Sequence, residues 1–128
     1  MKKKILIVVA NYYKEISKIL VKSAIKKMNN FIKIKIIKVP GVFEIPVTIV
    51  KNIKKYDGII ALGCVIKGET PHFDFISKSA TNAIMKISVD YKKPIGNGIL
   101  TCLNMSQAKK RSKKGAEAAE AVKSVLSQ

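Results

Sequence analysis

The chain has 128 residues, a length that predicts one domain, residues 1–128, able to bury about two-thirds of its unfolded surface. Its formal net charge of +17 suits contact with nucleic acid, an anionic membrane or phosphorylated compounds. The lysines are nevertheless scattered, and only residues 109–114 form a dense basic run. No stretch approaches the roughly 18 apolar residues of a membrane span, so we expect a protein that does not enter the membrane.

Among the basic residues Arg111 is the single arginine, and His72 is the single histidine. Such an excess of lysine over arginine indicates that the chain uses lysine generally at its surface positions, and does not indicate a single basic face. Guanidinium groups bind phosphate in a bidentate manner and imidazole transfers protons near neutral pH, so both residues are candidates for function. Cys64 and Cys102 have neither CxxC nor metal-ligand spacing, so we expect reduced thiols in a cytoplasmic protein.

Predicted strands and helices alternate along the chain. The opening residues resemble a signal peptide, but their apolar run is six residues, too short for one, so we predict a first strand over residues 4–10. A helix follows over 15–29, a partly alternating edge strand over 31–39, and a short helix over 43–55 entered through Pro46. The remaining predicted elements are a strand at 57–63, a long helix at 71–91, a strand at 95–101, and helices at 104–111 and 115–126.

This alternation predicts a three-layer α/β/α domain. Right-handed crossovers would give one mainly parallel, four-stranded sheet with helices on both faces. In such sheets, ligands bind in the crevice outside the carboxyl ends of the strands. Four connections are expected there, at residues 11–14, 40–46 and 64–71 and after Thr101, and three of them carry side chains able to bind a ligand.

The passage from the third strand into the long helix is the most informative stretch. An apolar run typical of a fully buried strand leads through Gly63 and Gly68 to Thr70 at the N-cap and Pro71 at the first helical position. The unpaired amides of that helix start and of the loop before it would make an anion site. The positive helix end also disfavours an imidazolium, so we expect a neutral His72 able to accept a proton. A solvated cap histidine is the competing interpretation, and the residues alone leave both open.

Residues 63–74, GCVIKGETPHFD, closely resemble the signature of the lumazine synthase family. The resemblance extends from Val8 to Val122: GVFEIP at 41–46 is similar to the family's G-A-F-E-[IL]-P, and residues 94–111 to P-[VI]-x-[FN]-G-[VI]-L-T…Q-A…R. It implies a flavodoxin-like fold and a transferase of riboflavin biosynthesis. The implied reaction condenses 5-amino-6-(D-ribitylamino)uracil with 3,4-dihydroxy-2-butanone 4-phosphate to 6,7-dimethyl-8-ribityllumazine, phosphate and water, without cofactor or metal.

The same resemblance implies roles for single residues. His72 would act in proton transfer, as the histidine of G-x-T-x-H, and Glu69 and Thr70 would bind the phosphate. Arg111 falls on the family's phosphate-binding arginine, which a neighbouring subunit supplies; the alternative is a solvated cation at a helix end. Tyr12 stands where the family has an aromatic residue that stacks on the pyrimidine ring, although a loop tyrosine covering the sheet end has nearly equal weight.

The ring and ribityl contacts come from three further segments. Val42, Phe43 and Glu44 would hold the ring and the ribityl hydroxyls, and a glutamate there would also stabilise a helix dipole. The backbone of residues 64–66, Cys64, Val65 and Ile66, would lie beside the pyrimidine. We do not expect Cys64 to be a nucleophile, because a small buried residue explains it. Asn97 stands where many members have a phenylalanine that packs on the substrate ring from a neighbouring subunit, so it could offer hydrogen bonds to the heterocycle instead.

Several positions depart from the family pattern. Val42 replaces the commoner alanine and Lys67 the usual arginine, and the segment after Arg111 is several residues shorter, so that Lys114 matches the family's late lysine only loosely. The amino terminus lacks most of the strand that many members add to a neighbour's sheet. The resemblance implies a homo-oligomer with shared active sites, a pentamer or a pentamer-based assembly, and does not imply a closed shell.

Two other functions stay open at this stage. The charge and the basic run at 109–114 suggest a nucleic-acid-binding module, but an aromatic content of 6% and the lack of a nucleic-acid motif argue against it. We therefore expect small-molecule substrates and no nucleic-acid partner. The second alternative is a non-enzymatic shell or flavin-carrying relative that kept the fold and lost the chemistry.

Overall fold

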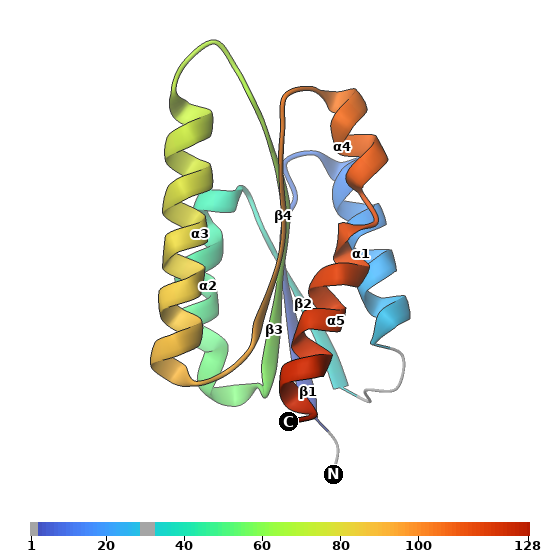
Figure 1. Cartoon of the computed structure of the whole chain (residues 1–128), viewed down its shortest axis with the longest axis vertical. Coiled ribbons are helices and arrows are strands. Elements are labelled where there is room, and N and C mark those ends of the chain that lie inside the picture. Colours follow the sequence, from blue (N-terminus) through green and yellow to red (C-terminus); the bar gives the residue numbers. More distant parts are fainter. Residues whose placement is uncertain (1–2, 29–32) are drawn as a thin grey trace.

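The structure, a computed structural model, describes residues 3–28 and 33–128, and its strands form one parallel sheet (Figure 1). Within these residues the strands are β1 (Lys4–Ala10), β2 (Lys33–Val39), β3 (Gly58–Ile66) and β4 (Ile95–Cys102), in the order β2-β1-β3-β4. This order matches the first four strands of the flavodoxin-like order 2-1-3-4-5. The predicted α/β class, the parallel sheet and the edge position of the second strand are confirmed, while residues 29–32 of the predicted elements lie outside the described residues.

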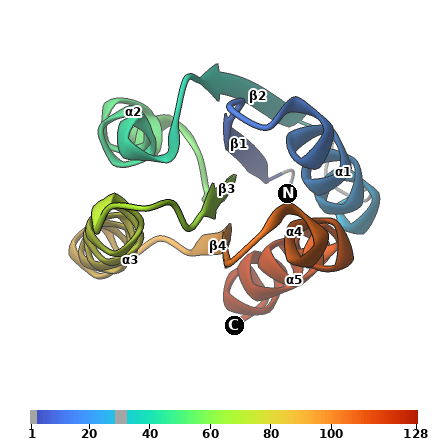
Figure 2. The same cartoon turned by 90° about the horizontal axis from the view of Figure 1, so that it is seen from above.

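Helices cover both faces of the sheet, as predicted (Figure 2). One layer holds α1 (Lys14–Lys27), α4 (Met105–Arg111) and α5 (Lys114–Leu126), and the other holds α2 (Ile45–Asn52) and α3 (His72–Tyr91). The helix predicted over 43–55 is instead three elements, because 3-10 turns η1 (Val42–Glu44) and η2 (Ile53–Lys55) flank α2. The residues of η1 lie at the carboxyl ends of the strands, together with the ends of β1 and β3.

The core is divided by the sheet into two apolar clusters. Ile5, Ile7 and Val9 of β1 point toward α1 and α5, while Leu6 and Val8 point toward α2 and α3, and all five are fully or almost fully buried. Burying a side chain of this size stabilises the fold by about 1.5–3 kcal/mol. A strand buried on both faces cannot alternate between polar and apolar residues, which is why this segment is almost continuously apolar.

The layer of α5 is held close to its neighbours by glycines. A Cβ at Gly115 would collide with the Leu20 carbonyl of α1, and a Cβ at Gly96 would collide with the Ala118 carbonyl of α5. Both contacts are with backbone, which cannot move away as a flexible side chain can. The two glycines therefore fix how closely α5 approaches α1 and β4.

The carboxyl end of α3 is tied to the segment before β3. Lys92 ends the helix in the left-handed conformation, with φ of 54°. The next residue, Lys93, donates from Nζ to the carbonyl oxygens of Ile53 at 2.8 Å and Lys54 at 3.4 Å. An ammonium group suits these acceptors, because carbonyl groups at a helix end have no partner within the helix. The amino-end side of the sheet is thereby anchored between η2 and β4.

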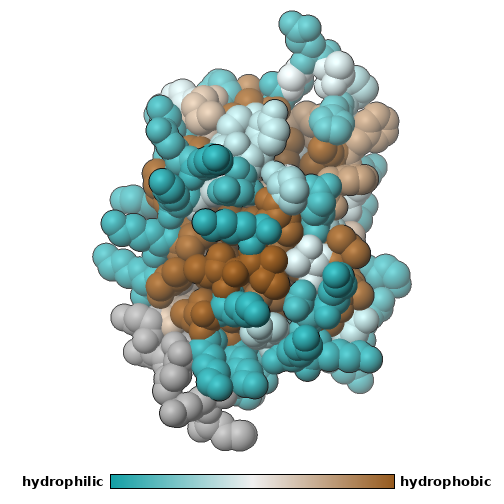
Figure 3. Space-filling view, turned by 180° about the vertical axis from the view of Figure 1, so that it is seen from behind, coloured by the Kyte–Doolittle hydropathy of each residue, from teal (hydrophilic) through white to brown (hydrophobic). Residues whose placement is uncertain are grey.

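The sheet leaves β2 with a free edge on the rear of the molecule. Seen from behind, apolar side chains gather in the middle of that surface (Figure 3). Ile36 of β2 and Val47 and Val50 of α2 are among the exposed large apolar residues. Unpaired strand edges and exposed apolar patches are places where other chains dock. In the part of the chain that the structure describes, no helix is long and apolar enough to cross a membrane.

Candidate active site

A crevice of about 590 Å³ lies at the carboxyl ends of the strands, between the loops that follow β1, β2 and β3. We call it the carboxyl-end crevice. Its residues come from three of the four connections predicted to meet there; the turn after β4 does not contribute. The lining residues are Tyr12, Tyr13, Pro40, Gly41, Val42, Phe43, Glu44, Cys64, Val65, Ile66, Gly68, Thr70, His72, Phe73 and Ile76.

The loop after β2 is closed by a hydrogen bond to the side chain of Glu44, which lies within the loop. The Gly41 amide donates to Glu44 Oε1 at 2.9 Å, while the Glu44 amide donates to the Gly41 carbonyl at 3.2 Å. Glu44 therefore has the structural role of an N-terminal cap as well as a place in the crevice. Val42 is buried beneath the loop, and Phe43 is 66% exposed at the crevice mouth. An exposed aromatic ring beside a carboxylate suits a ligand with both a flat apolar part and hydroxyl groups.

The strand β3 forms the floor and runs further than its sequence predicts. Residues 64–66 are expected in a loop, but Cys64, Val65 and Ile66 pair with Leu100, Thr101 and Cys102 of β4, so the strand continues to Ile66. Its backbone edge is thus rigid where the crevice begins.

The Cys64 thiol at this floor is a poor candidate for chemistry. Burial, and then the neighbouring Cys102, raises the pKa of the Cys64 thiol to about 12. The reactive form of cysteine is the thiolate, which is scarce at neutral pH when the pKa is this high. The thiol is therefore part of the wall and not a nucleophile.

The start of α3 places His72 and Thr70 at the crevice. The predicted N-cap is Thr70, but the helix begins at His72 and Pro71 takes the cap position. The Thr70 hydroxyl still serves the helix start, since its Oγ1 accepts a long hydrogen bond of 3.4 Å from the His72 amide. The first helical hydrogen bonds, from Asp74 and Phe75 to the Pro71 carbonyl, begin after this point. Apart from the His72 amide, which donates to Thr70, the amides before them are available to an anion, beside an exposed imidazole.

Two tyrosines from the loop after β1 complete the wall. Tyr12 is 72% exposed, and its ring meets that of Tyr13 edge-to-face, with centroids 4.9 Å apart. Burial, and then the adjacent Tyr12 and Cys64, raises the pKa of the Tyr13 phenol, which stays neutral at physiological pH. The pair offers one open ring face held by a second ring, an arrangement suited to stacking.

Three predicted site residues lie outside the crevice of a single chain. Glu69 is exposed in the loop and does not line it, although its neighbours Gly68 and Thr70 do. Asn97 lies in β4 opposite Ala61, away from the strand ends, and its Oδ1 accepts from the Ile99 amide at 2.9 Å. Arg111 ends α4, which covers the opposite face of the sheet from α3 (Figure 2), and lines a separate hollow.

The sequence also left some lining residues unassigned. Tyr13 and Phe73 line the crevice although the sequence motifs assign no role to either, and Phe73 lies in the first turn of α3 next to His72. Ile76 of α3 both packs on the core and reaches the crevice. The signal available for Phe73 and Ile76 was their spacing of three residues, which places both on the same side of a helix. No three His, Cys, Asp or Glu side chains of the described residues lie together as metal ligands would.

The geometry defines the class of protein first. An open parallel sheet in flavodoxin-like order, with a ligand crevice at the carboxyl ends of its strands, is a three-layer α/β binding fold. The sequence profile of the 6,7-dimethyl-8-ribityllumazine synthase family matches residues 2–128. The chain belongs to this family.

Individual relatives agree with this assignment. The enzyme named 6,7-dimethyl-8-ribityllumazine synthase from Bartonella tribocorum is 43% identical over 126 residues, covering 91% of this chain and 83% of its own. The enzyme of the same name from Corynebacterium kroppenstedtii is 44% identical over 93 residues, covering 67% of this chain and 58% of its own, so that this alignment spans little more than half of that relative. Among solved structures, a short-chain flavodoxin associated with a bacterial microcompartment matches 98% of this chain and 99% of its own, with 14% identity and a TM-score of 0.41.

Proposed function

We propose that this protein is a 6,7-dimethyl-8-ribityllumazine synthase, which condenses 5-amino-6-(D-ribitylamino)uracil with 3,4-dihydroxy-2-butanone 4-phosphate and releases phosphate and water. The observation that carries this proposal is the carboxyl-end crevice. It brings the imidazole of His72, the free amides of a helix start and the loop at 41–44 around one hollow of about 590 Å³. That hollow is of the size typical of small-molecule sites.

Each part of the crevice has a task in this reaction. The uracil derivative would lie against Tyr12 and Phe43, with its ribityl hydroxyls toward Glu44 and its pyrimidine along the β3 edge at residues 64–66. The ketone phosphate would lie at the start of α3, where amide groups and the Thr70 hydroxyl favour an anion. This arrangement leaves His72 between the two substrates.

The chemistry needs little beyond orientation and one proton carrier. One amine of the uracil attacks the ketone and loses a first water to form an imine. Phosphate then leaves by elimination, and the second amine attacks the carbonyl group that results and closes the ring with loss of a second water. Fixing two reactants in one crevice contributes several kcal/mol, of the order of 7 or more in well-oriented cases, by replacing a bimolecular encounter. A positioned base contributes about 10²- to 10⁴-fold, which we assign to His72.

The protein would act as a homo-oligomer, a pentamer or an assembly of pentamers, in the cytoplasm. Two observations on the described residues support an assembly with shared sites. Arg111 lies away from its own chain's crevice, so only a neighbour's crevice could use it for phosphate. Met85 and Val89, one turn apart on α3, are 64% and 65% exposed, and such apolar pairs on a helix surface suit contact with another chain.

Product formation tests the proposed reaction. The purified chain is mixed with both substrates, and the absorbance of the lumazine and the release of phosphate are followed together. Equal amounts of the two products are expected. Binding of the lumazine without any turnover would instead identify the non-enzymatic relative. Tight oligonucleotide binding at physiological ionic strength, with a steep salt dependence and no turnover, would favour the nucleic-acid-binding module.

Arg111→Ala tests the shared site. We expect the KM for the ketone phosphate to rise by about tenfold or more, because a charge-assisted contact contributes about 1.5–3 kcal/mol. Refolding this variant together with His72→Ala subunits should restore activity, since a crevice with intact His72 can then receive an intact Arg111. An unchanged KM, or no recovery on mixing, would contradict the assignment.

A further inference from the structure

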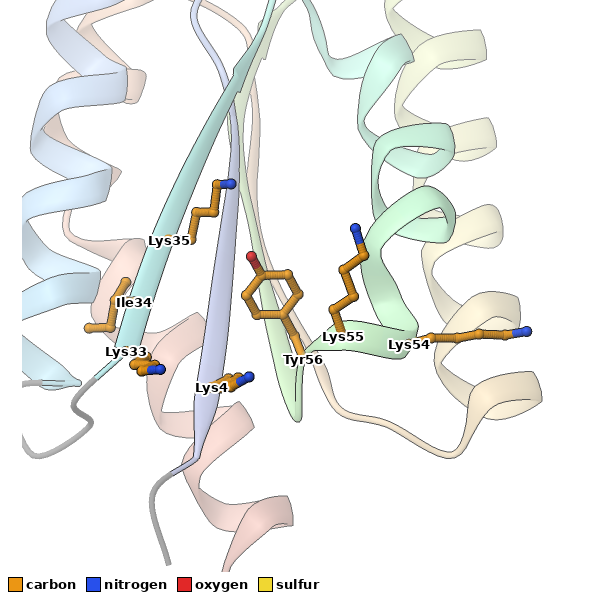
Figure 4. Close-up of a pocket in the computed structure, with 7 residues that line it drawn as sticks. All are labelled: Lys4, Lys33, Ile34, Lys35, Lys54, Lys55 and Tyr56. Atoms are coloured by element: carbon orange, nitrogen blue, oxygen red, sulfur yellow. The ribbon is translucent and has the colours of Figure 1, made fainter.

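A second hollow, of about 810 Å³, lies at the other end of the strands, where β1 and β2 begin (Figure 4). Its walls come from the start of β1, the start of β2 and the end of η2. The lining residues are Lys4, Lys33, Ile34, Lys35, Lys54, Lys55 and Tyr56. We call it the lysine hollow. It has no part in the reaction proposed above, and none of its residues lines the carboxyl-end crevice.

The strand register places three of these lysines on one face of the sheet. Lys4 lies directly opposite Lys33 in the β1–β2 ladder, and Lys35, two residues after Lys33, lies opposite Leu6. Residues two apart on a strand share a face, so all three lysines project on the side where Leu6 packs with α2. Like charges directly opposite each other on neighbouring strands destabilise a sheet. A bound anion would offset the repulsion between these lysines.

No carboxylate in the described part of the chain compensates these charges. The salt bridges found there join Lys27 to Glu120 and Lys86 to Asp90, on other elements. Asp57 is adjacent in sequence, but its Oδ2 accepts from the backbone amide of Lys4 at 2.7 Å, and it does not line the hollow. No salt bridge of the described residues therefore pairs a lysine of the hollow with a carboxylate.

A half-buried tyrosine stands among the ammonium groups. Figure 4 shows Tyr56 between Lys35 and Lys55, with its hydroxyl directed toward Lys35, whereas the ammonium group of Lys54 points away. Tyr56 packs on the apolar cluster beneath it, so its ring is a fixed wall. The η2 wall is anchored as well, because Lys93 bonds to its carbonyl groups. The Tyr56 ring and the η2 backbone therefore give the lysine hollow a fixed wall.

We propose that the lysine hollow binds an oligophosphate, a small anion with two or more linked phosphate groups. Lysine ammonium groups are strong point charges that need no fixed angle to phosphate oxygens. Four of them lie on three separate elements, and cross-strand and i,i+2 neighbours are about 5–7 Å apart, so a single phosphate would not reach them all. The hollow is bounded by η2 on one side and has one aromatic ring, which suits a compact ligand better than a nucleic-acid strand that needs a long groove.

A second lysine-lined groove provides a matched control. It lies between α1 and β2 and includes Lys18, Lys22 and Lys38. Lys38 lies opposite Val9 in the ladder, and the other two lysines are on a helix, so none of these three faces another lysine across paired strands. Replacing them removes the same charge from the protein without touching the lysine hollow.

The experiment compares two triple variants of the full chain. In one, Lys4, Lys33 and Lys35 become glutamine, and in the other Lys18, Lys22 and Lys38 do. Calorimetric titration with inorganic tripolyphosphate at 150 mM salt, a concentration that screens the long-range charge, measures the affinity of each. We expect at least tenfold weaker binding in the first variant and less than a twofold change in the second. Thermal unfolding curves of both variants verify that they fold.

Amide chemical shifts locate the site in the unmodified protein. Tripolyphosphate should shift the amides of residues 4, 33–35 and 54–57, and these shifts should saturate separately from any shifts at the phosphate site of residues 70–73. A nucleoside triphosphate is titrated in parallel: tighter binding than tripolyphosphate, with additional shifts at Tyr56, would identify a nucleotide as the source of the phosphates, and equal binding would identify free oligophosphate. Equal weakening in both triple variants, shifts confined to residues 70–73, or binding of single-stranded RNA but not of tripolyphosphate would overturn the proposal.

Discussion

The two ends of the parallel sheet carry hollows of opposite construction. At the carboxyl ends the wall is mixed: backbone amides at the start of α3, aromatic rings, one carboxylate and His72. At the amino ends the wall is almost uniform, since lysine side chains and Tyr56 supply nearly all of it. Both hollows are suited to phosphate, the first through main chain and a few particular side chains, and the second through clustered charge.

The direction of the helices explains the difference. In a parallel α/β fold the helices begin near the carboxyl ends of the strands and end near the amino ends. The positive ends of their dipoles therefore lie at the carboxyl-end crevice, where the main chain alone favours an anion. The amino-end side receives carbonyl groups and the negative dipole ends, and an anion there requires added cations. Lys93 already supplies a cation on this side, where its ammonium group binds the carbonyl groups of Ile53 and Lys54.

His72→Ala should give the largest effect and separate the two ends. We expect turnover to fall about 10²- to 10⁴-fold without vanishing, because the base is lost while both substrates remain oriented. Steady-state kinetics of lumazine formation measures this. Tripolyphosphate affinity should be unchanged in the same variant, because His72 is not part of the lysine hollow. Complete loss of turnover with substrate binding intact would show that orientation contributes less than we propose.

Gly63→Ala tests how tightly the main chain of the carboxyl-end crevice is packed. The new Cβ would lie 2.9 Å from Val42 Cγ2 and 3.1 Å from Ala10 Cβ, so the wall must shift. We expect the free energy of unfolding to fall by about 1–3 kcal/mol, measured by urea denaturation. Gly68→Ala is the control, because no heavy atom lies within 4 Å of its added Cβ. Similar midpoints for the two variants would mean that the floor of the crevice adapts easily.

Lys93→Met tests the anchor at the other end. The variant keeps the apolar stem and loses the hydrogen bonds from Nζ to Ile53 and Lys54, at 2.8 Å and 3.4 Å. Because bonds to a charged group contribute about 1.5–3 kcal/mol and this group is only partly buried, we expect a loss of about 1–2 kcal/mol in chemical denaturation. Lys92→Met, at the exposed neighbouring position, should change stability far less. Equal stability of both variants would show that the anchor is dispensable.

Lys33→Glu should give the smallest effect and has the opposite sign. It replaces a like-charge pair with a complementary one, because Lys4 lies opposite position 33 in the ladder. We expect a gain of about 0.2–1 kcal/mol in the free energy of unfolding, diminishing as salt is added, together with weaker tripolyphosphate binding. Lys38→Glu, opposite Val9, is the control and should show no comparable gain. A destabilised Lys33→Glu protein would mean that the lysines of the hollow do not repel each other.

Local sequence patterns predicted much of the fold and part of the site. The long helix predicted over 71–91 is confirmed as α3, and its residues Ile76, Ala80, Ile84 and Ile87 pack on the core. The motifs at 41–46 and 63–74 pointed to residues that now line one crevice, apart from Glu69. The ends of strands and helices were predicted less accurately. For example, β3 continues to Ile66 because it pairs with β4, and this pairing is a non-local interaction.

The sequence by itself determined the alternation of strands and helices, the family and the choice of His72, because side-chain periodicity and short motifs are local properties of the chain. Only the tertiary structure decided which loops meet. It separated Arg111 and Asn97 from the crevice of their own chain, and it gathered lysines at positions 4, 33, 35 and 55 around one hollow. The physical reason is that strand register and crossover direction set distances between residues far apart in sequence, and the local pattern of a segment does not encode them.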